Sequence, residues 1–164
     1  MVGCDVVGLY PNLDPINVAR ISADAVRHSK VKFKGVDYCM LAIYLVLILG
    51  EHTMAKLGLQ ECIPKRKYAD GKKTGNPRSL SNSLNRDTTN WDCSGLNLTD
   101  RNKTEMLANL IQLMVLLMTG TTCYRFGGHI YKQKGGLGIG LRGSAAIANL
   151  AMGRWDVLWA ERMK

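Results

Sequence analysis

Residues 126–152 read FGGHIYKQKGGLGIGLRGSAAIANLAM, and they indicate more about the fold than any other part of the chain. Two strand-like runs, 121–126 and 129–133, flank the pair Gly127-Gly128, a pattern typical of a β-hairpin. A glycine-rich turn follows, and a helix is expected from Ser144 to about Met163. The predicted order is therefore strand, tight turn, strand, glycine-rich turn and helix.

The glycine-rich turn, residues 134–143, has two simpler interpretations. A loop of this composition can precede a helix without any special role. The letters GGLGIG also resemble the phosphate-binding fingerprint of dinucleotide-binding folds. That fold needs the turn to open a βαβ unit with a later acidic residue, and no such unit follows residue 143. The dinucleotide interpretation is therefore set aside.

The amino-terminal stretch CDVVGLYPNL, residues 4–13, places a carboxylate among apolar strand formers. A strand is expected over residues 2–10, and its alternation would put Asp5 and Tyr10 on opposite faces unless the strand bends at its end. A buried and unpaired carboxylate is costly, so Asp5 would need a metal ion, a basic partner or solvent. A surface Asp at a strand end explains Asp5 alone equally well.

The pattern Asp5-x-x-x-x-Tyr10 followed by Pro-Asn-Leu resembles motif A of reverse transcriptases, and DVVGLYPNLD is especially similar to Penelope-like retroelements. The resemblance implies that Asp5 is the catalytic carboxylate and binds two Mg²⁺ ions, one of them also held by the backbone carbonyl of Val6. It further implies that the Tyr10 ring packs under the sugar of the incoming nucleotide and excludes a 2′-hydroxyl.

Residues 126–152 resemble motif B of the same family together with the hairpin before it. The resemblance implies that Gly136 lets the backbone approach the templating base pair, and that Gln133 binds a minor-groove edge or the surroundings of the incoming nucleotide. Ala145 stands where the family has proline, and Ile139 where it has methionine. The positions that match are Tyr131, Gln133, Gly136, Gly140, Ser144, Ala148, Asn149, Leu150 and Met152.

Other elements of that family are not found in these 164 residues. No aromatic-x-Asp-Asp turn, the family's motif C, follows residue 152, and no fingers motif precedes Asp5. The resemblance covers the two ends of the chain and does not extend to residues 30–120. This chain is therefore expected to be part of a palm that cannot extend a primer by itself. The absence of motif C favours an alternative, a non-catalytic nucleic-acid-binding or structural remnant of a retroelement polymerase.

The rest of the chain predicts helices and one polar insertion. Asp14-Pro15 is a typical helix start, and a helix is expected over residues 16–28. A longer helix is expected over 36–57; its run of twelve apolar residues is shorter than the roughly twenty that span a membrane. Another helix, 104–118, is apolar almost all round and is expected to be buried. Residues 60–103 read as a polar and basic insertion that is either a solvated loop or a contact with a phosphate backbone.

Charge and cysteines narrow the class of protein. The formal net charge of +9 favours polyanionic partners, most simply nucleic acid. Five cysteines without a CxxC pair make a zinc site improbable on sequence grounds and suggest reduced thiols. An intracellular location, nuclear or cytoplasmic, is therefore expected.

Together these patterns predict an α+β fold dominated by helix: a partial polymerase palm with a small antiparallel sheet backed by helices, in one domain over residues 1–164. The function that the resemblance implies is RNA-directed DNA polymerase, with RNA template, DNA primer and dNTP as partners, two Mg²⁺ ions as cofactors and no membrane. The apolar helices also suggest a homo-oligomer, or a helical interaction protein as a third class. Asp5 and Gln133 are expected to line one concave surface.

Overall fold

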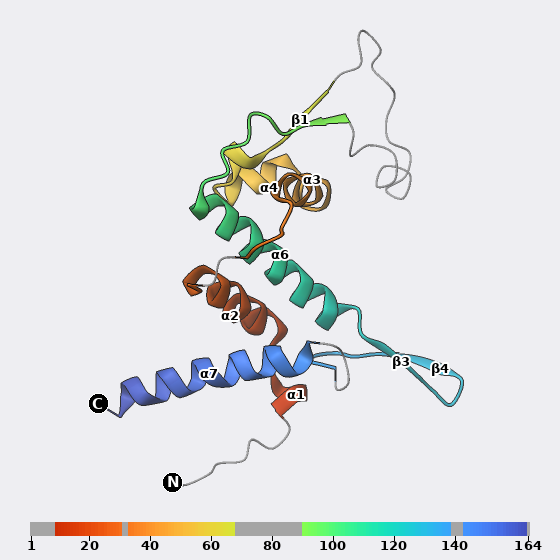
Figure 1. Ribbon diagram of the computed structural model, residues 1–164. Coiled ribbons are helices and arrows are strands. Elements are labelled where there is room, and N and C mark those ends of the chain that lie inside the picture. The colour runs from red at the N-terminus through yellow and green to blue at the C-terminus, as the bar shows by residue number, and fades with distance from the viewer. Residues whose placement is uncertain (1–8, 31–32, 68–89, 139–142, 164) are drawn as a thin grey trace. The chain divides into compact units, whose positions relative to one another are not determined.

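The chain is helix-dominated with two small antiparallel sheets, and its fold class is α+β, as expected. The computed structural model describes residues 9–30, 33–67, 90–138 and 143–163 (Figure 1). A single domain is expected from the sequence, and the chain divides into two compact units. We call residues 1–30 with 107–164 the terminal unit, and residues 31–106 the middle unit.

The terminal unit is built on the packing of two helices, α2 (Pro15–His28) and α7 (Ser144–Arg162). Small side chains such as Ala19 and Ala148 allow the two helices to approach closely, and each is almost fully buried. The short helix α1 (Leu9–Asn12) packs against the same core. The buried core residues are Val18, Ala19, Val115, Leu137, Ile147, Ala148 and Ala151.

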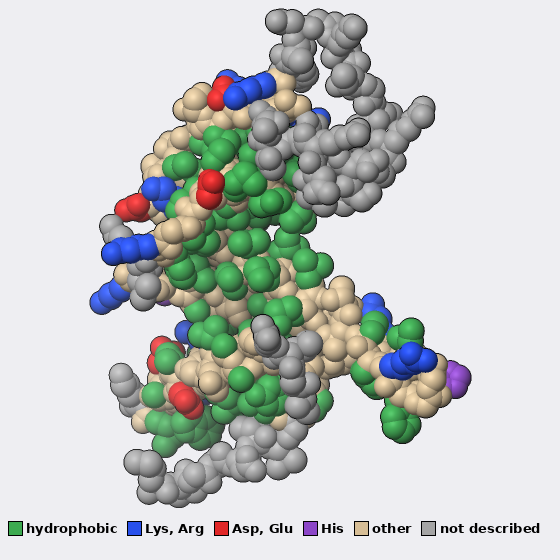
Figure 2. Space-filling view, turned by 45° about the vertical axis from the view of Figure 1, so that its right-hand side comes forward, with side chains coloured by type: hydrophobic (Ala, Val, Ile, Leu, Met, Phe, Trp, Pro, Cys, Tyr) green, Lys and Arg blue, Asp and Glu red, His purple; other side chains and the backbone are tan. Residues whose placement is uncertain are grey.

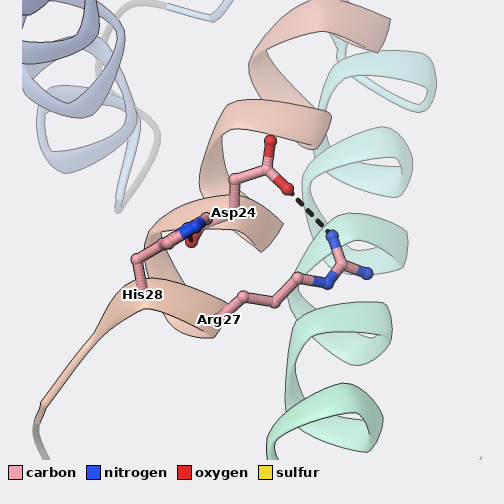
Figure 3. A network of polar contacts seen from close by, with 3 residues as sticks. All are labelled: Asp24, Arg27 and His28. Carbon is pink, nitrogen blue, oxygen red and sulfur yellow. Dashed lines mark hydrogen bonds and ion pairs between the residues drawn. The ribbon is translucent and has the colours of Figure 1, made fainter.

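Helix α2 begins and ends with local polar contacts. The Asp14 carboxylate accepts a hydrogen bond from the backbone N–H of Asn17 (2.9 Å), and Pro15 is the first helical residue, so the expected helix start is confirmed. In the last turn, Arg27 pairs with Asp24 at 3.0 Å, and Nδ1 of His28 lies 2.8 Å from the Asp24 carbonyl oxygen (Figure 3). The positive charge of Arg27 also interacts favourably with the negative end of the helix dipole.

The expected hairpin is confirmed. Strand β3 (Cys123–Phe126) pairs with β4 (His129–Lys132), and the turn residues Gly127 and Gly128 have φ of +56° and +81°, which side chains rarely tolerate. Every residue of the two strands is exposed. Helices therefore do not back this hairpin, contrary to the sheet expected from the sequence.

The strand expected over residues 2–10 is wrong at its end, because Leu9 and Tyr10 belong to helix α1. Residues 2–8 lie outside the described residues. Pro11 and Asn12 complete the helical turn that begins at Leu9. This places the Tyr10 backbone on a helix rather than in a pleated strand.

The middle unit contains two helices where one was expected. The segment 36–57 forms α3 (Tyr38–Leu49) and α4 (Glu51–Lys56), because Gly50 adopts φ +80° and interrupts the helix. The Asp37 carboxylate caps α3 through the N–H groups of Cys39 and Met40, both at 3.0 Å.

Part of the expected insertion 60–103 has regular structure. A 3₁₀ turn, η1 (Gln60–Cys62), precedes β1 (Lys65–Arg66), which pairs with β2 (Trp91–Asp92). The Arg66 guanidinium lies 4.9 Å from the centre of the buried Trp91 ring, a cation–π contact. Residues 68–89, which hold several of the basic side chains, lie outside the described residues.

The next helix, α6 (Asp100–Gly120), begins four residues earlier than expected. It is also not buried all round, since Met114 and Leu117 are 47% and 51% exposed. These two side chains belong to an exposed apolar surface on α6, and an exposed apolar surface is what the expected homo-oligomer would cover. The oligomeric state itself stays a prediction. Among the described residues, no helix has both the length and the apolar character needed to cross a membrane.

The cysteines differ from expectation. Cys39 and Cys93 form a disulfide, so the prediction that all are reduced thiols is wrong, and the cysteines no longer support an intracellular location. Of the other described cysteines, Cys123 is exposed and Cys62 is buried. Burial, together with the Glu61 carboxylate, raises the pKa of the Cys62 thiol, which favours its neutral form.

We expect the Cys39→Ser variant to lower the free energy of unfolding by about 2–4 kcal/mol, because the disulfide closes a loop between residues 54 apart in sequence. Urea denaturation followed by circular dichroism measures the change. The Cys123→Ser variant, which removes an exposed free thiol, is the control and should unfold like the parent. Equal stability of all three proteins would contradict the role given to the disulfide.

Candidate functional site

The two stretches that carry the sequence resemblance meet in the terminal unit. The backbone N–H of Leu137, in the glycine-rich turn, donates a hydrogen bond of 2.8 Å to the backbone carbonyl of Tyr10 in α1. Leu137 is buried and belongs to the core between α2 and α7, and Tyr10 packs partly buried against that core. The amino-terminal element and the glycine-rich turn thus form one junction, although they come from opposite ends of the chain.

Gly136 is required at this junction by two independent constraints. Its φ of +75° lies in the left-handed region, which favours glycine. A Cβ at this position would lie 2.5 Å from the Tyr10 carbonyl oxygen and 2.6 Å from both the Cα and the carbonyl oxygen of Pro11. These are backbone atoms, which cannot rotate away as a side chain would. The backbone at Gly136 therefore lies directly against the Tyr10–Pro11 backbone. The approach of Gly136 to a templating base pair, which the resemblance implies, stays a prediction.

Gln133 lies at the root of the hairpin, beside the same junction. Its backbone N–H donates to the Thr122 carbonyl (3.0 Å), which continues the hairpin pairing one residue beyond β4. Its side-chain Nε2 donates to the Gly135 carbonyl at 2.7 Å. The amide side chain consequently stabilises the bend that leads into Gly136.

A hollow of about 400 Å³ opens beside Gln133. It includes the side of α1 that holds Pro11 and the start of the hairpin, so Gln133 and the amino-terminal element share one concave surface. Its volume is within the range of small-molecule sites. The lining residues are Pro11, Thr122, Cys123, Tyr124, Gln133, Leu137 and Gly138.

The start of α7 is attached to the same turn. Gly143 has φ +92° and precedes the first residue of the helix, Ser144. The buried Ser144 hydroxyl donates to the Gly138 carbonyl at 2.8 Å. The match of Ser144 to the family pattern therefore has a structural explanation, the fixing of the turn on the helix. Residues 139–142, which include Ile139 and Gly140, lie outside the described residues.

Of the five residues that the sequence assigns to the site, three come together. The Gly136 backbone packs against the Tyr10 carbonyl oxygen, to which the next residue, Leu137, donates its N–H. Gln133 lines the adjoining hollow. Asp5 and Val6 lie outside the described residues, so their roles and the expected closeness of Asp5 to Gln133 stay predictions.

The described residues do not provide a magnesium centre. No group of three or more His, Cys, Asp or Glu side chains gathers in the part of the chain that is described. The Asp14 carboxylate, close to α1 in sequence, accepts the cap hydrogen bond of α2. The Mg²⁺ site that the resemblance implies falls on Asp5 and Val6, which lie outside the described residues, so it stays a prediction.

One lining residue, Tyr124, is not singled out by sequence reasoning. The signal is present, because alternation along TTCYRF places Tyr124 and Phe126 on one face of the expected strand.

Comparison with known proteins adds no further assignment: no protein-family model, no curated protein and no solved structure matches the chain.

We expect Gly136→Ala to destabilise the chain by roughly 2 kcal/mol more than Gly128→Ala. Both variants put a side chain on a positive φ, but Gly128 has no atom within 4 Å of the added Cβ, whereas Gly136 meets backbone. Urea midpoints measured by circular dichroism give the comparison. Equal losses for the two variants would mean that Gly136 does not pack against Tyr10 and Pro11.

Proposed function

We propose that this chain is part of the palm of a reverse transcriptase, similar to those of Penelope-like retroelements. In that function it holds the nascent base pair of an RNA template and a DNA primer during RNA-directed DNA synthesis. Tyr10, Gln133 and Gly136 border the incoming nucleotide and the templating base. Asp5 would hold both Mg²⁺ ions that the resemblance implies, and the Val6 carbonyl would help to hold one of them; when bound, these ions would supply electrostatic stabilisation of nucleotidyl transfer.

The observation that carries this proposal is the junction between Tyr10 and Gly136. Each of the two stretches taken alone has an ordinary explanation, as a strand end or as a loop before a helix. Both belong to one site only if they are close in space, and the 2.8 Å hydrogen bond between the Leu137 N–H and the Tyr10 carbonyl joins them. The requirement for glycine at position 136 supports the same interpretation.

The hollow beside Gln133 supports a nucleotide-facing role. Its lining combines apolar residues with Gln133 and Thr122. The Gln133 Nε2 and the Thr122 hydroxyl donate to the Gly135 and Met118 carbonyls, which leaves the Gln133 Oε1 and the Thr122 hydroxyl oxygen as acceptors for the edge of a base or a sugar. The net charge of +9 favours binding of a phosphate backbone to the protein as a whole. Neither property distinguishes a polymerase from a simple nucleic-acid-binding protein, so the test has to include a nucleotide.

The alternative function is a non-catalytic nucleic-acid-binding remnant of such a polymerase. It is favoured by the exposed hairpin, whose aromatic and basic side chains need no metal ion to bind nucleic acid. The two functions differ in one respect. A palm site distinguishes the complementary dNTP from the others, whereas a remnant binds primer–template without regard to the nucleotide.

The test is fluorescence anisotropy of a labelled RNA-template/DNA-primer duplex with the 164-residue chain, in Mg²⁺. We expect weak binding that falls steeply as salt rises, because phosphate contacts supply most of the affinity. The dNTP complementary to the next template base should tighten binding several-fold over the other three. The Gln133→Ala variant should lose this preference, while Gln112→Ala, a glutamine on α6 away from the hollow, should keep it.

Binding that is the same with all four dNTPs would contradict the palm and support the remnant. An absence of binding to primer–template at low salt would contradict both functions.

A further inference from the structure

The β3–β4 hairpin has two chemically different faces. Residues opposite each other in the register share a face, and the pairs are Tyr124 with Tyr131 and Phe126 with His129. One face therefore consists of four aromatic rings. The Tyr124 and Tyr131 rings are stacked, with centroids 5.7 Å apart and planes 16° from parallel. We call these four residues the aromatic face.

The aromatic face is open to solvent. Phe126 is 75% exposed, Tyr124 56% and Tyr131 44%, and His129 is exposed as well. The hairpin extends away from α7, and Figure 2 shows hydrophobic side chains on it beside Lys, Arg and His side chains. Exposed rings of this number are unusual on a protein surface and indicate a binding function.

The remaining hairpin residues determine what kind of partner fits. The opposite face holds Arg125 and Lys132, which belong to the other two register pairs, and Lys134 follows β4. Residues 121–143 contain no Asp or Glu, so no acidic side chain of the hairpin neutralises this charge. Aromatic rings on one face of a two-stranded hairpin and positive charge on its other face are two components with which proteins bind single-stranded nucleic acid: bases stack on the rings, and the charge attracts the phosphate backbone.

We propose that the aromatic face binds single-stranded nucleic acid, with bases stacked on Tyr124, Tyr131 and Phe126, while the positive charge of Arg125 and Lys132 on the opposite face attracts the strand to the hairpin. Such stacking tolerates any base sequence, because every base has a π-face. A second copy of the chain fits less well, since like positive charges would be brought together along both hairpins.

The aromatic face is continuous with the candidate site. Tyr124 belongs both to this face and to the lining of the hollow that holds Gln133 and Pro11. A single strand stacked on the hairpin is thereby directed toward the hollow, which makes it the unpaired template ahead of the templating base. This role as a template guide rests on the proposed function, whereas the binding of a single strand does not.

The experiment measures anisotropy of a fluorescein-labelled single-stranded pyrimidine RNA with the full chain, at low salt and without primer, dNTP or Mg²⁺. The double variant Tyr124→Ala/Tyr131→Ala should bind at least about tenfold more weakly, because stacking contributes at each base. The double variant Tyr124→Phe/Tyr131→Phe retains the rings and should bind like the parent. Trp159→Ala removes an exposed ring from α7 (64% exposed) and is the matched control, with binding unchanged. Circular dichroism of each variant checks that it is folded.

Any of the following results would overturn the inference: no binding of the single strand by the parent chain, equal binding by the Ala double variant, or an equal loss in the Phe double variant. A parent that sediments as a dimer while the Ala double variant is a monomer would assign the aromatic face to a second copy and also overturn it. The single-strand assay contains no nucleotide, so its result is independent of the primer–template assay. If the parent chain binds the single strand but does not distinguish the complementary dNTP, the palm function alone is contradicted. If the parent chain distinguishes the dNTP but does not bind the single strand, the aromatic-face proposal alone is contradicted.

Discussion

The hydrogen bond from the Leu137 amide to the Tyr10 carbonyl is the interaction on which the site depends. It can form only because Gly136 has no side chain and adopts a positive φ, so that one backbone lies directly on another. Leu137 then enters the core between α2 and α7, which couples the geometry of the junction to the stability of the terminal unit. Any change that moves the glycine-rich turn moves Gln133 with it, since its amide is bonded to Gly135.

Around this junction the terminal unit is closely packed on one side and exposed to solvent on the other. Buried small residues hold α2 and α7 together, and the Ser144 hydroxyl attaches the turn to the start of α7. The hairpin beyond Gln133 is exposed on both faces, and the hollow lies where the two regions meet. In the proposed function, the packed side would position one base pair while the exposed hairpin contacts a longer strand.

Local signals in the sequence predicted the elements that short-range chemistry determines. Asp14-Pro15 and Gly127-Gly128 correctly marked a helix start and a hairpin turn, because capping and positive φ are properties of a few neighbouring residues. Gly50 carried the same kind of signal but was outweighed by the apolar run around it. The Cys39–Cys93 disulfide joins residues far apart, and no local pattern identifies it. Likewise, composition alone would not pair Tyr10 with Gly136; only the resemblance to a known family suggested that they belong together. The same resemblance predicted a sheet backed by helices, which is wrong for the exposed β3–β4 hairpin.

The proposed function requires that the Asp5 element and the glycine-rich turn form one metal-dependent site. The most direct test is paramagnetic broadening by Mn²⁺, used in place of Mg²⁺, in the NMR spectrum of the ¹⁵N-labelled chain. The account predicts selective broadening of the Gln133 side-chain amide and the Leu137 backbone amide, lost in Asp5→Asn and retained in Asp14→Asn. Broadening that spares both signals, or that persists unchanged in Asp5→Asn, would contradict it.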